Sequence, residues 1–316
     1  MDYDDLCIYQ KDISGVPRLT IDQINSIVVL QKIFDQVYIG SLSNHLIFIK
    51  YFSVNLSIER QNLIGAWDCE DGKTIAVYYR FSRPKDFPYY FPGKIFYRSD
   101  GVVKTLNPID QSIYDQLFVG KIFKSNSFSK YYEAKLITSE YSSDLVIKTP
   151  ITSLEITISD IVASHNLSPR IYGFWKTQYS YALITERIYG IPLDEYLKSA
   201  PNLTRLFREV GKSLLYLNLK LSISYDKFSL EYILIVPLEV KENKENEAIE
   251  RVYFMELFNT FFQEEPTLVD FDFFIREFSK ILQGNSIETT QLREFIRKIS
   301  KIPRNYDQLY NEFQTI

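Results

Sequence analysis

The segment 144–186 reads DLVIKTPITSLEITISDIVASHNLSPRIYGFWKTQYSYALITE and carries the clearest structural pattern in the 316-residue chain. Asp144–Lys148 predicts a short strand, which we expect to end at Thr149-Pro150 because proline cannot donate to a strand ladder. Ile171–Trp175 and Ser180–Glu186 predict two more strands, each rich in β-branched and aromatic residues. Strands therefore flank the middle of this segment on both sides.

A helix is predicted between these strands. Ser153 is the expected N-cap residue. Leu154, Ile158, Ile161 and Val162 follow at spacings that place them on one helical face.

The residues before this segment predict two more strands, Phe118–Phe123 and Tyr131–Ile137, joined by the polar turn Lys124–Lys130. Residues after it predict a helix of five turns, with an apolar stripe at Leu203, Leu206, Phe207, Val210, Leu214, Leu217 and Leu221. Ile233–Val236 and Thr267–Val269 predict short buried strands. The chain then ends in helices, with apolar positions at Phe274, Phe278, Ile281, Leu282, Leu292, Phe295, Ile296 and Ile299.

The first 110 residues predict a mixed region that contains strands. Thr74–Phe81 is rich in β-forming residues, and Ser99-Asp100-Gly101 indicates a hairpin between Ile95–Tyr97 and Val102–Val103. The run KENKENEAIER at 241–251 has no apolar stripe beside its charges, so we expect a solvated loop.

Composition excludes several classes of protein. The chain has 36 Lys and Arg against 40 Asp and Glu, a net charge of -4, which argues against a dedicated nucleic-acid binder. Cys7 and Cys69 are too few for a disulfide framework, and two histidines, His45 and His165, argue against a His-ligated metal centre. No apolar run is long enough for a membrane span, and the acidic N-terminus does not predict a signal peptide. With reduced thiols expected, we predict a cytoplasmic location.

The order of elements resembles that of the protein-kinase-like superfamily. The resemblance rests on Asn166–Leu197, on the strand ending at Lys148, and on Asp270-Phe271-Asp272, which is similar to the Asp-Phe-Gly motif of kinases. It covers about two thirds of the chain and is closest to compact viral or fungal kinase-like proteins. It implies an α+β, bilobal fold with a five-stranded small lobe (116–190), a trimmed helical large lobe (191–316) with a charged insertion near 241–251, and a β-containing accessory or interaction region (1–115).

The resemblance also assigns roles to individual side chains. Lys148 would hold nucleotide phosphates, Glu155 at the start of the helix would position Lys148, and Asp270 would bind Mg²⁺. For Glu155 the alternative is a simple electrostatic preference for the helix N-terminus. Glu186 and Arg187 fall in the segment that is similar to the hinge between lobes. ATP and Mg²⁺ are therefore the candidate ligands.

Several positions depart from the kinase pattern. The turn that aligns with the glycine-rich loop has Lys124, Asn126 and Ser129 where the family has glycines, and glycine lets the backbone approach phosphates closely. Lys124 is the residue that offers a compensating cation. Tyr232 replaces the metal-binding asparagine, and Asp226 reaches the catalytic position only with a one-residue shift.

Three functions follow from these patterns. The first is a pseudokinase that acts by binding a protein partner, with weak or no nucleotide binding. The second is an active but divergent ATP-dependent phosphotransferase that uses Asp226 as its base. The third is a structural or interaction protein unrelated to kinases, which a chain without five strands between 118 and 186 would favour.

Overall fold

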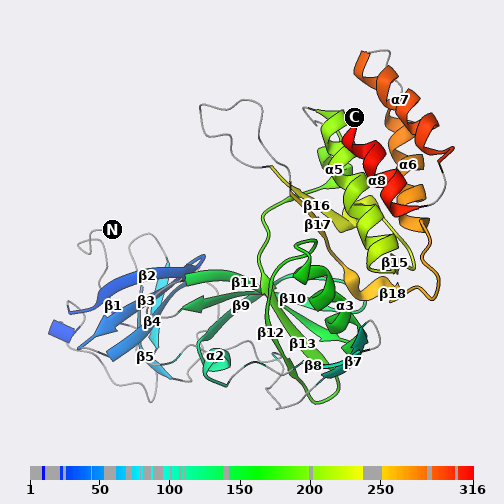
Figure 1. The fold of residues 1–316 in the computed structure, drawn as a ribbon. Helices are drawn as coiled ribbons and strands as arrows, with labels where there is room; N and C mark the ends of the chain where they lie inside the picture. The colour runs from blue at the N-terminus through cyan, green and yellow to red at the C-terminus, as the bar shows by residue number, and fades with distance from the viewer. Residues whose placement is uncertain are drawn as a thin grey trace. The chain divides into compact units, whose positions relative to one another are not determined.

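The structure, a computed structural model, combines helices with several antiparallel sheets, which confirms the expected α+β class (Figure 1). It describes residues 9–10, 22–23, 26–43, 45–52, 62–68, 73–78, 80, 87, 95–99, 102–106, 109, 111–137, 142–198, 202–237, 251–282, 287–302 and 305–316. The chain divides into two units. The first contains Met1–Phe87, Gln116–Lys121 and Glu133–Ser142, and the second contains Pro88–Asp115, Ile122–Tyr132 and Ser143–Ile316. The expected divisions after residues 115 and 190 stay predictions.

The first unit contains a six-stranded antiparallel sheet in the order β1-β5-β6-β4-β3-β2. Its strands are β1 (Tyr9–Gln10), β2 (Val28–Phe34), β3 (Val37–Leu42), β4 (His45–Phe52), β5 (Leu63–Asp68) and β6 (Thr74–Tyr78). Ile47 and Ile49 belong to one apolar cluster and Phe48 to another, so alternate residues of β4 are buried on opposite faces. Burial on both faces also explains why, after Thr74, β6 is apolar at every position from 75 to 78.

A hairpin and a short helix lie between this sheet and the next in the sequence. The hairpin is formed by β7 (Ile95–Ser99) and β8 (Val102–Leu106), as the sequence predicts. It is followed by α2 (Gln111–Asp115). The charged run at 241–251 lies outside the described residues except for Arg251.

The second sheet contains the five strands expected between 118 and 186. They are β9 (Leu117–Ser125), β10 (Lys130–Ile137), β11 (Ser142–Ile151), β12 (Ile171–Lys176) and β13 (Tyr181–Glu186), in the order β12-β13-β11-β10-β9. The expectation that Thr149-Pro150 ends a strand is wrong, because β11 continues to Ile151. The pairing with β13 shifts register between Lys148 and Ile151, and this irregularity accommodates a residue that cannot donate a hydrogen bond.

The helix α3 (Ser153–Ser164) follows directly, and its N-cap is Thr152, one residue before the predicted Ser153. The Thr152 hydroxyl accepts a hydrogen bond from the Glu155 backbone N–H at 3.1 Å. Glu155 therefore occupies the third helical position, where a glutamate often reaches back to the cap. Its carboxylate instead turns toward β11, as described below.

The remaining helices are α4 (Leu193–Tyr196), α5 (Leu203–Leu215), α6 (Val269–Ile281), α7 (Ile287–Ile299) and α8 (Tyr306–Gln314), and α5 runs on into a π-helical turn, η2 (Tyr216–Lys220) (Figure 1). Phe207 on α5 is fully buried at their centre. Its ring contacts Phe274, Phe278 and Phe313, with centroids 4.8 to 5.5 Å apart. The apolar stripe predicted for α5 is thus the core of this helical part. Among the helices of the described residues, none has the length and apolar character that a membrane span requires.

Among the described residues, four short strands lie between α5 and α6, and one of them, β16 (Ile233–Val236), pairs with β14 (Ile191–Pro192), which precedes α4. With β17 (Arg251–Phe254), β14 and β16 form one sheet, and β15 (Ile223–Tyr225) pairs with β18 (Thr260–Phe262). Two 3-10 turns, η3 (Leu230–Tyr232) and η4 (Leu257–Asn259), precede β16 and β18.

The strand predicted at Thr267–Val269 is wrong, because Val269 begins α6. Phe271, Phe274 and Phe278 continue at helical spacing and are buried, so the helical pattern prevails over the short apolar run.

Candidate functional site

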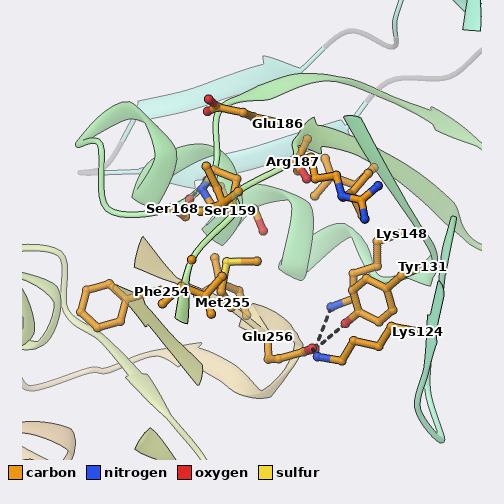
Figure 2. A pocket seen from close by; sticks show the side chains of 18 of the residues that line it. Lys124, Tyr131, Lys148, Ser159, Ser168, Glu186, Arg187, Phe254, Met255 and Glu256 are labelled. Atoms are coloured by element: carbon orange, nitrogen blue, oxygen red, sulfur yellow. Dashed lines mark hydrogen bonds and ion pairs between the residues drawn. The ribbon is translucent and has the colours of Figure 1, made fainter. Parts of the chain in front are cut away.

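A cavity of about 550 Å³ lies in the second unit, a size typical of small-molecule sites (Figure 2). Its lining comes from β9–β11, α3, the segment 183–192 and the end of the β16–β17 hairpin. Five of the predicted site residues line it: Lys124, Lys148, Glu155, Glu186 and Arg187. The structure therefore brings together most of the side chains that the sequence singles out.

Lys148 forms a buried ion pair with Glu155. Its ammonium nitrogen lies 2.5 Å from Glu155 Oε1, and their side chains are only 9% and 5% exposed. Burial raises the pKa of the Glu155 carboxyl, and the charge of Lys148 opposes that rise. The pair exists because β11 and α3 are joined by a tight connection whose cap, Thr152, directs the first turn of the helix toward the strand.

Glu256, which the sequence analysis missed, supplies a second carboxylate to the same ammonium. Glu256 Oε2 lies 3.7 Å from Lys148 Nζ, and Glu256 Oε1 lies 2.5 Å from Lys124 Nζ. The Tyr131 hydroxyl donates to Glu256 as well. Figure 2 shows these three side chains pointing toward the Glu256 carboxylate. Burial alone would raise the pKa of Glu256, but Lys148, Lys124 and the Tyr131 hydroxyl together hold it below its usual value. Glu256 therefore stays ionised.

The backbone at Glu256 is unusual. Its φ is +54°, in the left-handed region of backbone conformation that residues other than glycine and asparagine rarely adopt. Glu256 lies two residues after β17 ends at Phe254, and η4 begins at the next residue, Leu257. This turn aims the carboxylate back at the sheet that carries Lys124 and Lys148.

Asn126 organises the turn between β9 and β10. Its side-chain oxygen accepts from the backbone N–H groups of Phe128 and Ser129, at 2.9 and 2.6 Å. This Asx turn therefore uses two backbone N–H groups of the turn internally. The Phe128 ring, 64% exposed, packs on Phe258 at a centroid distance of 5.4 Å. The turn is therefore tied to the 255–258 segment by an aromatic contact as well as by charge.

The segment 186–190 forms another wall of the cavity. The N–H of Glu186 donates to Arg170, and that of Arg187 donates to Asp144, which fixes the start of the segment. The Arg187 guanidinium lies over the Phe123 ring at 5.0 Å. In the described part of the chain, neither the backbone N–H nor the backbone C=O of Ile188 has a hydrogen-bond partner, although Ile188 lines the cavity.

Asp270 is not among the residues that line the cavity of Lys148. It is fully buried in the first turn of α6, where one carboxylate oxygen accepts from the Asn218 amide at 2.8 Å and from the Tyr225 N–H at 3.1 Å. Burial raises the pKa of Asp270, and these hydrogen bonds oppose the rise. The side chain thus anchors α6 to β15 through the Tyr225 N–H. Val269, the last residue of the predicted strand, is the first residue of this helix.

The ionic contacts described above involve neither the Asp226 nor the Tyr232 side chain. Asp226 is exposed and lines a different hollow, beside Ser224 and Gln263. The Tyr232 ring stacks on Tyr225 with centroids 5.6 Å apart and packs against the helical core. Within the described ranges, no three His, Cys, Asp or Glu side chains are grouped so as to hold a metal ion.

Glu256 could have been found from one signal in the sequence. Val252, Tyr253 and Phe254 form a short apolar run, and Met255-Glu256 follows it directly. An acidic residue after a buried strand is a candidate site residue. The short apolar run at 267–269 offers the same pattern, and Asp270, which follows it, is the residue that the sequence analysis names. Comparison with known proteins adds no further assignment, since the chain matches no protein-family model and no curated protein.

Proposed function

We propose that this chain is a kinase-like protein that does not transfer phosphate and acts instead by binding, as a pseudokinase. The observation that carries the proposal is the state of Glu256. It is the carboxylate opposite Lys148, and Lys124, Tyr131 and Lys148 already engage it. A carboxylate with these partners is not available to hold Mg²⁺ against phosphates, which phosphoryl transfer requires.

Three features support the kinase-like part of the proposal. A lysine on a strand paired with a glutamate on the following helix is the arrangement that protein kinases use. An antiparallel five-stranded sheet precedes a helical part in the same chain. Ile188, whose backbone groups have no hydrogen-bond partner among the described residues, lies in the segment that resembles the interlobe hinge.

Three further features support the loss of transfer. The Asx turn at Asn126 uses two backbone donors of the loop that would cover phosphates. Asp226, the expected base, does not line the cavity of Lys148. Tyr232 packs in the core where a metal-binding asparagine would stand. Each loss removes a group that normally contributes orders of magnitude to the rate.

Phosphoryl transfer is the direct test. The purified chain is incubated with γ-labelled ATP and Mg²⁺ or Mn²⁺, and phosphate release and self-labelling are measured. We expect no signal above that of the matched variant Asp226→Asn. Turnover by the wild type that disappears in Asp226→Asn would overturn the proposal and favour an active, divergent phosphotransferase.

A binding role also makes a positive prediction. A pseudokinase that acts through a protein partner should retain that partner when Asp226 is neutralised, because the role does not use transfer. Capture on immobilised wild type and Asp226→Asn, followed by mass spectrometry, should yield the same protein at the same level. A partner retained only by the wild type would argue for a catalytic role.

A further inference from the structure

The turn between β9 and β10 is fastened to the other side of the cavity at both of its ends. We call residues 124–131 the flap. Its first residue, Lys124, has its ammonium nitrogen 2.5 Å from Glu256, and the hydroxyl of its last residue, Tyr131, donates to the same carboxylate. Both residues line the cavity, and Figure 2 shows their side chains pointing toward Glu256.

An aromatic contact joins the middle of the flap to the same part of the chain. The Phe128 ring packs on Phe258, and the Phe258 ring in turn lies under the Lys148 ammonium at 4.9 Å. Phe128 is nevertheless mostly exposed, so this contact removes little apolar surface from water and contributes less than a core contact would. The contacts with Glu256 are therefore the main attachment of the flap.

The charged groups inside the flap are buried, whereas its first residue is not. The Lys148, Glu155 and Glu256 side chains are 9%, 5% and 8% exposed. The Lys124 side chain is 53% exposed. Among the ionic contacts of this cluster, the one between Lys124 and Glu256 is therefore the most open to screening by salt.

The two sides of the flap are held differently. On the β10 side, the buried Ser129 hydroxyl donates to the Pro150 carbonyl at 2.8 Å, which holds this side on β11. The Asn126 side chain accepts from the N–H groups of Phe128 and Ser129, so the turn keeps its own shape. On the β9 side the attachment is the ion pair of Lys124. Loss of that ion pair would free the β9 side while the turn itself stays folded, which is a local opening.

We propose that the flap is an internal latch: the free chain keeps it closed over Lys148 through the contact of Lys124 with Glu256, and loss of this contact exposes Lys148 to solvent. The left-handed backbone of Glu256, with a φ of +54°, directs its carboxylate to this contact. Anything that reaches the charged end of the cavity must first open the flap. The proposal concerns access to the cavity, so it goes beyond the proposed function and does not depend on it.

The reactivity of the Lys148 amine measures how often the flap is open. The full-length chain is treated at neutral pH with a small amine-acylating reagent, and the acylation rate at each lysine is measured by mass spectrometry. This rate follows the population of the open form when opening and closing are faster than acylation. We expect Lys148 to react about fivefold faster in Lys124→Met than in the wild type, the upper end for an ion pair with one exposed partner. Loss of a nearby positive charge by itself stabilises the unreactive ammonium, so a faster reaction reports access and not charge.

Two controls and a change of salt locate the effect. Lys121→Met removes an exposed lysine of the same strand that takes no part in these contacts, and it should leave the Lys148 rate unchanged. Lys212 on α5, half-buried with its ammonium 5.5 Å from the centroid of the Tyr310 ring, is the reference within each sample. Raising the salt concentration from about 0.05 M to about 0.5 M should speed acylation of Lys148 in the wild type and have little effect on it in Lys124→Met.

An unchanged Lys148 rate in Lys124→Met would overturn the proposal, and so would an equal response to salt in the two proteins. A parallel rise at Lys148 and Lys212 would also overturn it, because general unfolding would then expose Lys148. The wild type decides even if Lys124→Met does not fold: a ratio of the Lys148 rate to the Lys212 rate that rises with salt supports the latch, and a constant ratio contradicts it. None of these measurements uses a nucleotide, so their outcome is separate from that of the phosphate-transfer assay.

Discussion

Removing either partner of the Lys148–Glu155 pair should destabilise the protein by different amounts. Lys148→Met leaves two carboxylates, Glu155 and Glu256, in a cluster with side-chain exposures of 5% and 8%. It also removes the ammonium from above the Phe258 and Tyr131 rings, at 4.9 and 5.2 Å. Breaking a buried pair in this way costs about 3–5 kcal/mol.

Glu155→Gln should cost less, about 1–2 kcal/mol, because Lys148 keeps Glu256 at 3.7 Å and the glutamine oxygen still accepts a hydrogen bond. Whether Glu155→Gln destabilises or stabilises the protein should depend on whether Lys148 is present. In the Lys148→Met background Glu155 has no cation, so replacing it with neutral glutamine should stabilise the protein.

The wild type, the two single variants and the double variant form a double-mutant cycle. Urea unfolding at neutral pH, followed by circular dichroism, gives the unfolding free energy of each, and we expect the same dependence on urea concentration in all four. Lys280→Met is the control: its side chain is 62% exposed and its ammonium nitrogen lies 2.7 Å from Glu277, so the change should cost under about 1 kcal/mol. If Glu155→Gln destabilises both backgrounds equally, the ammonium does not hold that carboxylate and the account of the cluster is incorrect.

Three other substitutions probe the helical part. Burial raises the pKa of Asp270, so the native state holds this proton more tightly than the unfolded chain. The protonated carboxyl therefore contributes to the unfolding free energy in acid, and this contribution is lost as the pH rises from about 4 through the raised pKa. The unfolding free energy of Asp270→Asn, measured across the same pH range, should not show that decline. Asn218→Ala removes the amide that bonds Asp270, the Ile223 carbonyl and the Phe271 N–H, and should lower the unfolding free energy by about 2–4 kcal/mol; a loss below 1 kcal/mol in urea would contradict this. Gly211→Ala would place a Cβ 2.4 Å from the Phe313 ring, so calorimetry should show a lower melting temperature and a loss of about 1–3 kcal/mol despite the better helix propensity of alanine.

The local part of the fold could be predicted from the sequence. The strands 118–123, 131–137, 171–175 and 180–186 and the helix stripe from Leu203 depend on periodicity within a few residues, and the structure confirms them. Two element boundaries, the start of α3 and the end of β11, differ from the predicted ones for local reasons. Thr152 caps α3 because its hydroxyl reaches the Glu155 N–H, and β11 passes through Pro150 because a register shift accommodates the proline.

The candidate site was harder to predict because part of it depends on long-range pairing. Lys148 and Glu155 are seven positions apart, and their pairing is one of the two interpretations that the sequence allows for Glu155. Glu256 reaches them only because β17 pairs with β16 across the intervening residues 237–250, and no local pattern indicates that pairing. The sequence indicates Asp270 as the site carboxylate because Asp270 also follows a short apolar run. The helical spacing of Phe271, Phe274 and Phe278 instead places Asp270 in α6.

The contact between Lys124 and Glu256 joins residues 132 positions apart. A contact of such sequence separation closes a very long loop and forms only when the segments at both ends have reached their final positions. Tyr131 contacts both residues: its hydroxyl donates to Glu256, and the Lys124 ammonium lies over its ring. The environment of this one ring therefore reports whether the contact between Lys124 and Glu256 has formed. The side chains that line the cavity therefore also couple the strands around Lys124 to the hairpin that precedes Glu256, so a change at one end should be felt at the other.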